Sequence, residues 1–242
     1  MDLALLERRL AAAVAPHDLL THPYYLAWNM GELTRGDLRA YAVQYRHQVD
    51  ALPVLLAQAR AQAQDSATVD ALDRNLSEEL GQIALQVLPD DAALPHRELW
   101  LRFAEGMGAT REEVLGSEAD PSTEAAVEGL HAVVRDGSVE ALAALWAYEM
   151  QTAKVSRTKR EGLVGRYGVT DARTLSFFAA HEALDVLHAA DLLSAVARAS
   201  AASTPAKVEA NVRRACDAAS RSAKAQWIFL DGAQARRAAV RN

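Results

Sequence analysis

The sequence has little cysteine, glycine or proline, and each shortage excludes a class of structure. Cys216 is the single cysteine, which excludes an internal disulfide framework and a metal cage built from several thiolates of one chain. The 12 glycines and 7 prolines in 242 residues leave long stretches without a helix breaker. A metal held within this chain therefore needs nitrogen and oxygen ligands, and regular helices are expected to dominate the fold.

Long apolar runs and an excess of positive charge are also missing. No stretch reaches the roughly 18 uninterrupted apolar residues of a membrane span, and the first residues lack the pattern of a signal peptide. The net charge of −6 argues against broad nucleic-acid binding, and we interpret the basic C-terminal Arg236, Arg237 and Arg241 as a solvated helix end. We expect one globular domain over residues 1–242, located in the cytoplasm, that binds neither membrane nor nucleic acid.

Apolar residues recur with helical spacing along nearly the whole chain, which predicts an all-α fold. Thr34, Ser138 and Thr170 are the expected N-caps of three helices, whereas Gly168 and Pro205 are expected to mark breaks. The predicted helices cover residues 2–14, 17–29, 35–62, 66–85, 95–107, 123–135, 138–165, 171–199 and 205–238.

Three potential metal ligands, His181, Asp185 and His188, recur at positions i, i+4 and i+7. At about 100° per residue their side chains fall within roughly 60° of one another on a helix, so they can converge on one point. The competing interpretation is an ordinary solvated polar face. Apolar neighbours such as Phe177 and Leu184 indicate burial instead, and a buried acid with two imidazoles requires a compensating partner.

Further carboxylates fall on apolar helix faces. Glu149 shares the face of Leu145 and Trp146, which is an unusual position for an acid. Glu79, rather than its neighbour Glu78, falls on the apolar face of its own helix. Helical bundles build metal sites from such inward-pointing acids, so both glutamates are candidate ligands.

His96 lies near an expected helix start and shares a face with Leu99, Trp100 and Phe103, although a cap or surface histidine is an equally good interpretation in isolation. Mixed imidazole and carboxylate ligation favours two iron or manganese ions over a closed zinc site, which would use four ligands. The candidate ligands are Glu79, His96, Glu149, His181, Asp185 and His188.

Ordered motifs between about residues 17 and 195 resemble the haem-oxygenase-like dimetal oxidases. Within these, the chain is most similar to the family of the chlamydial protein associating with death domains, whose bacterial members make 4-aminobenzoate for folate. The motifs are Trp28–Thr34, Tyr41 with Tyr45, Asn75–Glu79, His96 with Leu99 and Trp100, Phe103 with Gly108, Tyr148 with Glu149, and His181 with Asp185 and His188.

The resemblance implies a seven-helix haem-oxygenase-like bundle without haem and a dinuclear centre of two Fe ions or an Fe/Mn pair at the six candidate ligands. It implies that O₂ and an external reductant oxidise the side chain of Tyr25, which leaves the protein as the ring of 4-aminobenzoate. It further implies that Lys159 donates the amino group and that Tyr41 supports the chemistry. From the sequence alone, Lys159 belongs to the basic run 157–160 and would be placed on a solvated face.

The chain departs from this family between Glu79 and His96, where residues 81–95 form an apolar insertion. We expect the insertion to pack locally, as a helix extension or as a lid. If the insertion keeps His96 away from the site, we expect Glu78 or Asp91 to substitute as ligand, or one of the two metal ions to be weakly bound.

Three other functions compete with the self-consuming oxidase. The first is a dimetal oxygenase acting on an external amino acid, amine or fatty acid by N-oxygenation or C–C cleavage. The second is a cofactorless relative of pyrroloquinoline-quinone synthase or of the thiaminase-like proteins, and the third is a non-enzymatic interaction protein. The long C-terminal helix around Trp227 is compatible with a homodimer, and the sequence does not identify an electron donor.

Overall fold

The computed structural model describes residues 2–85 and 93–241, with the side chains of residues 240 and 241 left out. This part of the chain forms helices and their connections, with no strand in it, which confirms the all-α prediction. The elements are α1 (Leu3–Val14), η1 (Ala15–His17), η2 (Leu19–Thr21), α2 (Pro23–Met30), α3 (Arg35–Gln62), α4 (Ser66–Glu79), α5 (His96–Gly106), α6 (Arg111–Gly116), α7 (Pro121–Arg135), α8 (Ser138–Tyr167), α9 (Ala172–Ala199) and α10 (Pro205–Arg241). No helix within these residues is long and apolar enough to cross a bilayer.

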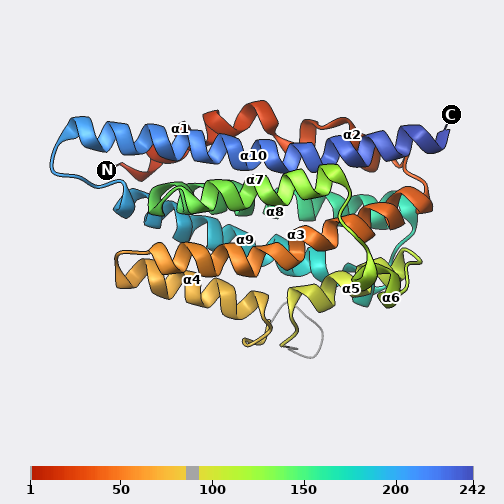
Figure 1. Cartoon of the computed structure of the whole chain (residues 1–242). Coiled ribbons are helices and arrows are strands. Elements are labelled where there is room, and N and C mark those ends of the chain that lie inside the picture. The colour runs from red at the N-terminus through yellow and green to blue at the C-terminus, as the bar shows by residue number, and fades with distance from the viewer. Residues whose placement is uncertain (1, 86–92, 242) are drawn as a thin grey trace.

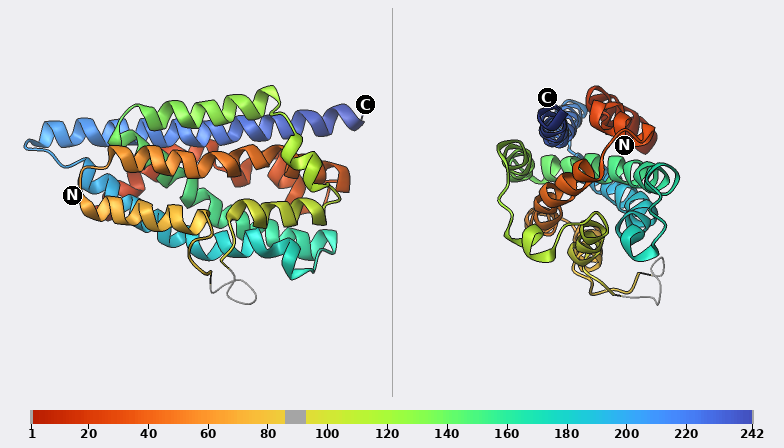
Figure 2. Two further views of the ribbon diagram at one scale, coloured as in Figure 1. Left: turned by 60° about the horizontal axis from the view of Figure 1, so that its bottom comes forward. Right: turned by 90° about the vertical axis from the view of Figure 1, so that its right-hand side faces the viewer.

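Helix α8 is the centre of the bundle. Residues 139–149 are buried without interruption, because small alanines alternate with large apolar side chains on every side of this helix. Helices α9 and α10 pack along it, and α7 lies beside α10 (Figure 1). The other helices surround α8 and α9 in the two views of Figure 2, and both helices carry many buried residues.

The core divides into an aliphatic and an aromatic part. The aliphatic part joins α1 and α3 with α7, α8, α9 and α10, whereas the aromatic part takes most of its rings from α2, α3, α5 and the first half of α9. Rings in the aromatic part contact one another edge-to-face or stacked, as aromatic pairs prefer. Both candidate ligands and candidate catalytic residues lie within these two parts.

Most predicted helix boundaries agree with the structure to within two residues, and two predicted helices are wrong in part. The predicted helix 17–29 begins only at Pro23, because a residue before proline avoids the helical region and His22 is extended with ψ of 137°. The predicted helix 66–85 ends at Glu79. Gly81 adopts φ of 66°, and the bonds from Gly81 N–H to Glu78 and from Gln82 N–H to Ser77 close a Schellman motif.

The predicted caps are partly wrong. Thr34 caps α3 in a reciprocal capping box with Asp37, as expected. The caps of α8 and α9 are Gly137 and Asp171, in place of the predicted Ser138 and Thr170. Gly168 ends α8 in the left-handed conformation, and Pro205 begins α10, as predicted. Helix α6, capped by Thr110 and Glu113, was not predicted although it carries the capping-box pattern.

The insertion 81–95 does not extend a helix in residues 81–85 or 93–95, and Leu85 is buried in the aromatic part of the core. Asp91, the alternative ligand, lies outside the described residues.

Candidate functional site

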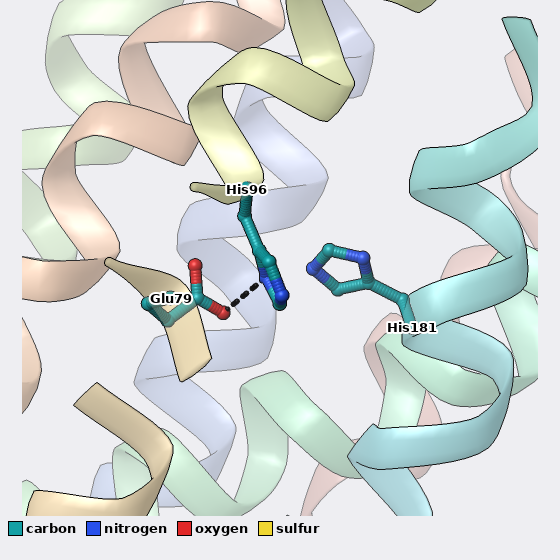
Figure 3. A group of neighbouring side chains, drawn as sticks. All are labelled: Glu79, His96 and His181. Atoms are coloured by element: carbon teal, nitrogen blue, oxygen red, sulfur yellow. Dashed lines mark ion pairs between the residues drawn. The ribbon is translucent and has the colours of Figure 1, made fainter. Parts of the chain in front are cut away.

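Glu79, His96 and His181 form the first of two buried groups. The Schellman motif leaves Glu79 in the last turn of α4, His96 is the first residue of α5, and His181 comes from α9. Figure 3 shows the three side chains pointing toward one another. His96 Nδ1 lies 2.8 Å from Glu79 Oε1, and the two imidazole centroids are 4.5 Å apart. One ligand atom from each residue lies within 4.8 Å of the other two, so the three can share an ion.

His181 is held in one orientation by its own helix. Its Nδ1–H donates to the carbonyl of Phe177 at 2.8 Å, and the Phe177 ring stacks on the imidazole at a centroid distance of 3.9 Å. This hydrogen bond leaves Nε2 with its lone pair free for a ligand. Burial, reinforced by the neighbouring His96, lowers the pKa of His181 far below its usual range. The imidazole is therefore neutral, as metal binding requires.

Glu149, Asp185 and His188 form the second group, with ligand atoms again within 4.8 Å of one another. His188 Nδ1 lies 3.9 Å from a carboxylate oxygen of Glu149 and 3.9 Å from one of Asp185. Its Nε2–H donates to Glu78 at 2.6 Å, which turns Nδ1 toward the group. Because His181, Asp185 and His188 stand on successive turns of α9, the two groups share one face of that helix.

Two residues outside the groups orient them, and neither was predicted in that role. Asn75, one turn before Glu79 on α4, donates its amide to Glu149 at 3.0 Å. Glu78 binds His188 and does not replace His96, which reaches the site itself. The spacing of Asn75 and Glu79 by four positions indicates that they share a helix face. No pattern in the sequence indicates that Asn75 contacts Glu149 on α8.

Several polar atoms of these groups lack hydrogen-bond partners among the described residues. They are Nε2 of His96, both carboxylate oxygens of Asp185, and Nδ1 of His188. All six residues of the two groups are at most 5% exposed. Burial and the adjacent Glu149 raise the pKa of Asp185 well above its usual range. Against the opposing effect of burial, Glu149 and Glu78 raise the pKa of His188 to about 11, so this imidazole carries a proton that a bound metal ion would displace. Buried carboxylates and imidazoles that face one another need such a positive charge, and the donor set fits divalent metal ions.

Tyr25, Tyr41 and Lys159 meet in the aromatic part of the core. The hydroxyls of Tyr25 and Tyr41 are hydrogen-bonded at 2.8 Å, and Lys159 Nζ donates to the Tyr41 hydroxyl at 2.5 Å. Lys159 Nζ also lies 4.5 Å from the centroid of the Tyr25 ring. These contacts place an amine directly beside two phenols.

Lys159 is only 4% exposed, so the expectation of a solvated face is wrong for this residue of the basic run. Its ammonium group has no carboxylate partner among the described residues, and burial lowers its pKa well below the usual range. Burial likewise raises the pKa of Tyr25 and of Tyr41. Burial therefore favours the neutral amine of Lys159 and the neutral phenols of both tyrosines.

A second tyrosine pair leads from this cluster toward Glu149. The rings of Tyr41 and Tyr45 stack at a centroid distance of 5.4 Å, and the hydroxyls of Tyr45 and Tyr148 lie 3.2 Å apart. Tyr148 directly precedes Glu149. Tyr45 stands one helical turn after Tyr41, and this spacing on one face was the available signal for its position.

Two pockets near the candidate site residues differ in volume and in the residues that line them. A cavity of about 10 Å³ lies beside Tyr25 and Lys159. A mainly apolar groove of about 360 Å³ lies between α1, α8 and α9, with Asp185 in its wall and Lys154 and Glu7 among its lining residues. The groove reaches a candidate ligand, whereas the cavity reaches the tyrosine–lysine cluster.

Known proteins resemble this chain over most of its length. Residues 15–222 match a family described as iron-containing redox enzymes. A 4-aminobenzoate synthase of Nitrosomonas europaea is 32% identical over 93% of this chain and 89% of its own, and one of Chlamydia trachomatis is 31% identical over 71% and 70%. A TenA homologue from Pseudomonas syringae, 16% identical, has the same fold with a TM-score of 0.75 over 96% of this chain and 94% of its own. The chain belongs to the haem-oxygenase-like family of iron-containing redox enzymes.

Proposed function

We propose that this oxidoreductase makes 4-aminobenzoate from the side chain of Tyr25. The observation that carries the proposal is the burial of Lys159 against the Tyr25 ring, at 4.5 Å from its centroid. The tyrosine ring with its Cβ has the same carbon skeleton as 4-aminobenzoate. The conversion breaks the Cα–Cβ bond, oxidises Cβ to a carboxylate, and replaces the phenol oxygen with an amine nitrogen. The names of the 4-aminobenzoate synthases that resemble this chain support the same product.

The proposed metal ligands are the six residues of the two buried groups. Two Fe ions or an Fe/Mn pair bound there would supply the activation of O₂, with electrons from an external reductant. Within the chain, His181 and His188 are oriented by Phe177 and Glu78, so the ring nitrogens that would bind an ion already face the site. Asn75 holds Glu149 in the same way.

The residues around Lys159 keep its amine neutral and close to the phenols. The centroids of the Trp28 and Tyr45 rings lie 5.4 and 5.1 Å from Nζ, so bulk water has little access to the amine. A neutral amine is a nucleophile, whereas an ammonium ion is not. Tyr41 accepts the hydrogen bond from Nζ and contacts the Tyr25 hydroxyl, and so it positions the amine beside the phenol.

The size of the neighbouring cavity supports an internal substrate. At about 10 Å³ it has no room for an external aromatic molecule beside Lys159. The groove of about 360 Å³ at Asp185 is the observation that favours the second candidate function, oxygenation of an external apolar substrate. Oxygenation of an external substrate does not explain why Lys159 is buried against Tyr25.

The experiment loads the purified protein with Fe(II), alone or with Mn(II), and adds O₂ and a reductant without organic substrate. Mass spectrometry then follows released 4-aminobenzoate and the mass of the peptide containing Tyr25. We expect product, and a Tyr25 peptide that loses the side chain. Tyr25→Phe and Lys159→Met should abolish the product, whereas Tyr24→Phe is the matched control, because the Tyr24 hydroxyl bonds to the Asp37 carbonyl instead. Consumption of O₂ with an intact Tyr25 peptide would refute the proposal.

We further place this enzyme in the cytoplasm as a homodimer, with an electron donor that is a separate protein or a small reductant. Light scattering of the purified chain tests the oligomeric state.

A further inference from the structure

The small cavity beside Tyr25 and Lys159 is lined by polar groups that the proposed chemistry does not use. Gln48 comes from α3, Thr152 and Ser156 from α8, and Gln226 from α10. Polar side chains from three helices thus meet in an otherwise aromatic region. Because these polar side chains come from helices far apart in the sequence and meet at one cavity, we expect a small polar molecule to bind them there.

The two glutamine amides are buried without partners. Gln48 is 2% exposed, and neither its amide nitrogen nor its amide oxygen has a hydrogen bond among the described residues. Gln226 is 5% exposed, and its amide nitrogen is equally unpartnered there. An unsatisfied buried amide is costly, and native proteins satisfy such groups with ordered water when space allows.

We propose that Gln48 and Gln226 hold one water molecule in this cavity and that Lys159 exchanges its proton through this water. The volume of about 10 Å³ corresponds to about one water-sized sphere, so the site takes one molecule. The amides offer donors and an acceptor, which suits a water that needs two to four partners. The hydration site is inferred only from the cavity and the unpartnered amides. The proton step additionally rests on the proposed function.

The proton step follows from the groups around Lys159. No carboxylate and no imidazole is among the cavity-lining residues that the structure describes. The hydroxyl of Tyr41 accepts one hydrogen bond from Nζ, and burial raises the pKa of Tyr41, so its phenolate is not available as a base. When the Nζ–C bond to the Tyr25 ring forms, the C–O bond of the phenol breaks, and one proton passes from the nitrogen to the departing oxygen, which leaves as water. A water held by Gln48 and Gln226 is the relay that the cavity provides for this proton, because Lys159 and Tyr25 both line the cavity.

The hydration site is tested first by a high-resolution crystal structure of the metal-loaded protein and by melting temperatures. We expect one water peak within hydrogen-bond distance of both amides, and its loss in Gln48→Met. If the cavity is hydrated, Gln48→Met and Gln226→Met lower or preserve the melting temperature. If it is dry, methionine removes an unsatisfied amide and raises the melting temperature. An empty cavity or raised melting temperatures would overturn the proposal. Gln64→Met, at an exposed loop position, is the control.

The proton step is tested by single-turnover formation of 4-aminobenzoate in H₂O and D₂O. We expect Gln48→Met and Gln226→Met to slow product formation at least tenfold and to increase the D₂O effect, with metal content unchanged. Equal rates and equal isotope effects in wild type and variants would overturn the proton step. Absence of product from the wild type would refute the proposed function instead and would leave the crystallographic result on the water standing.

Discussion

Replacing Lys159 by methionine should stabilise the protein at neutral pH and change how its stability depends on pH. Lys159 is 4% exposed and has no carboxylate partner among the described residues, so folding forces it to give up its proton. Methionine is unbranched and apolar, and it fills a similar space without a charge to desolvate. The substitution thus isolates the cost of burying this amine.

The magnitude follows from the pKa of a lysine in the unfolded chain, which is about 10.4. Burial lowers the folded-state pKa, so between the two values the unfolded state binds one more proton than the folded state. The free energy of unfolding of the wild type therefore rises with pH in this window, by about 1.4 kcal/mol per pH unit, and the penalty is gone above the unfolded-state pKa.

Urea unfolding of wild type and Lys159→Met between about pH 7.5 and 9.5 measures this difference. We expect the difference in free energy of unfolding between Lys159→Met and wild type to shrink by about 1.4 kcal/mol for each unit that the pH rises. Differences in packing between lysine and methionine change this free-energy difference by the same amount at every pH. The exposed Lys154→Met is the control and should show no such slope. Parallel curves for wild type and Lys159→Met would refute the reasoning that Lys159 is neutral in the folded protein.

Three further predictions concern the metal groups and the helix ends. Asn75→Ala removes the hydrogen bond to Glu149 and should weaken metal binding about 10- to 100-fold in a competition titration; unchanged affinity would contradict the orienting role. Removing metal with a chelator should lower the melting temperature, because the buried carboxylates lose their counter-charge; an unchanged value would argue against a buried centre. Thr34→Ala deletes the cap of α3 and should cost about 1 kcal/mol in urea unfolding, with no cost arguing against the capping box.

Helical spacing predicts most of this fold because local periodicity largely determines which faces are buried. His181, Asp185 and His188 converge for the same reason, since three positions on one helix face need no knowledge of the rest of the molecule. The predicted helices fail where the backbone is controlled by one residue. Pro23 delays α2, and Gly81 ends α4 earlier than the apolar pattern indicates.

Contacts between helices were harder to predict. The amide of Asn75 reaches Glu149 from another helix, and Glu78 turns His188, although nothing in the local pattern pairs these residues. Lys159 sits in a basic run that composition assigns to solvent, yet it is buried because it lies on the inner face of α8 with Val155 and Leu163, whereas Arg157 is on the exposed face. Its position beside Tyr25 was expected only from the resemblance to known oxidases.

The central claim is that the product ring comes from Tyr25, and isotope labelling tests it most directly. Protein produced with ring-deuterated tyrosine is loaded with metal and given O₂, reductant and no organic substrate. We predict released 4-aminobenzoate that carries all the ring deuterons, together with a Tyr25 peptide that has lost its side chain. Unlabelled 4-aminobenzoate, or no product from a metal-loaded protein that consumes O₂, would contradict the account.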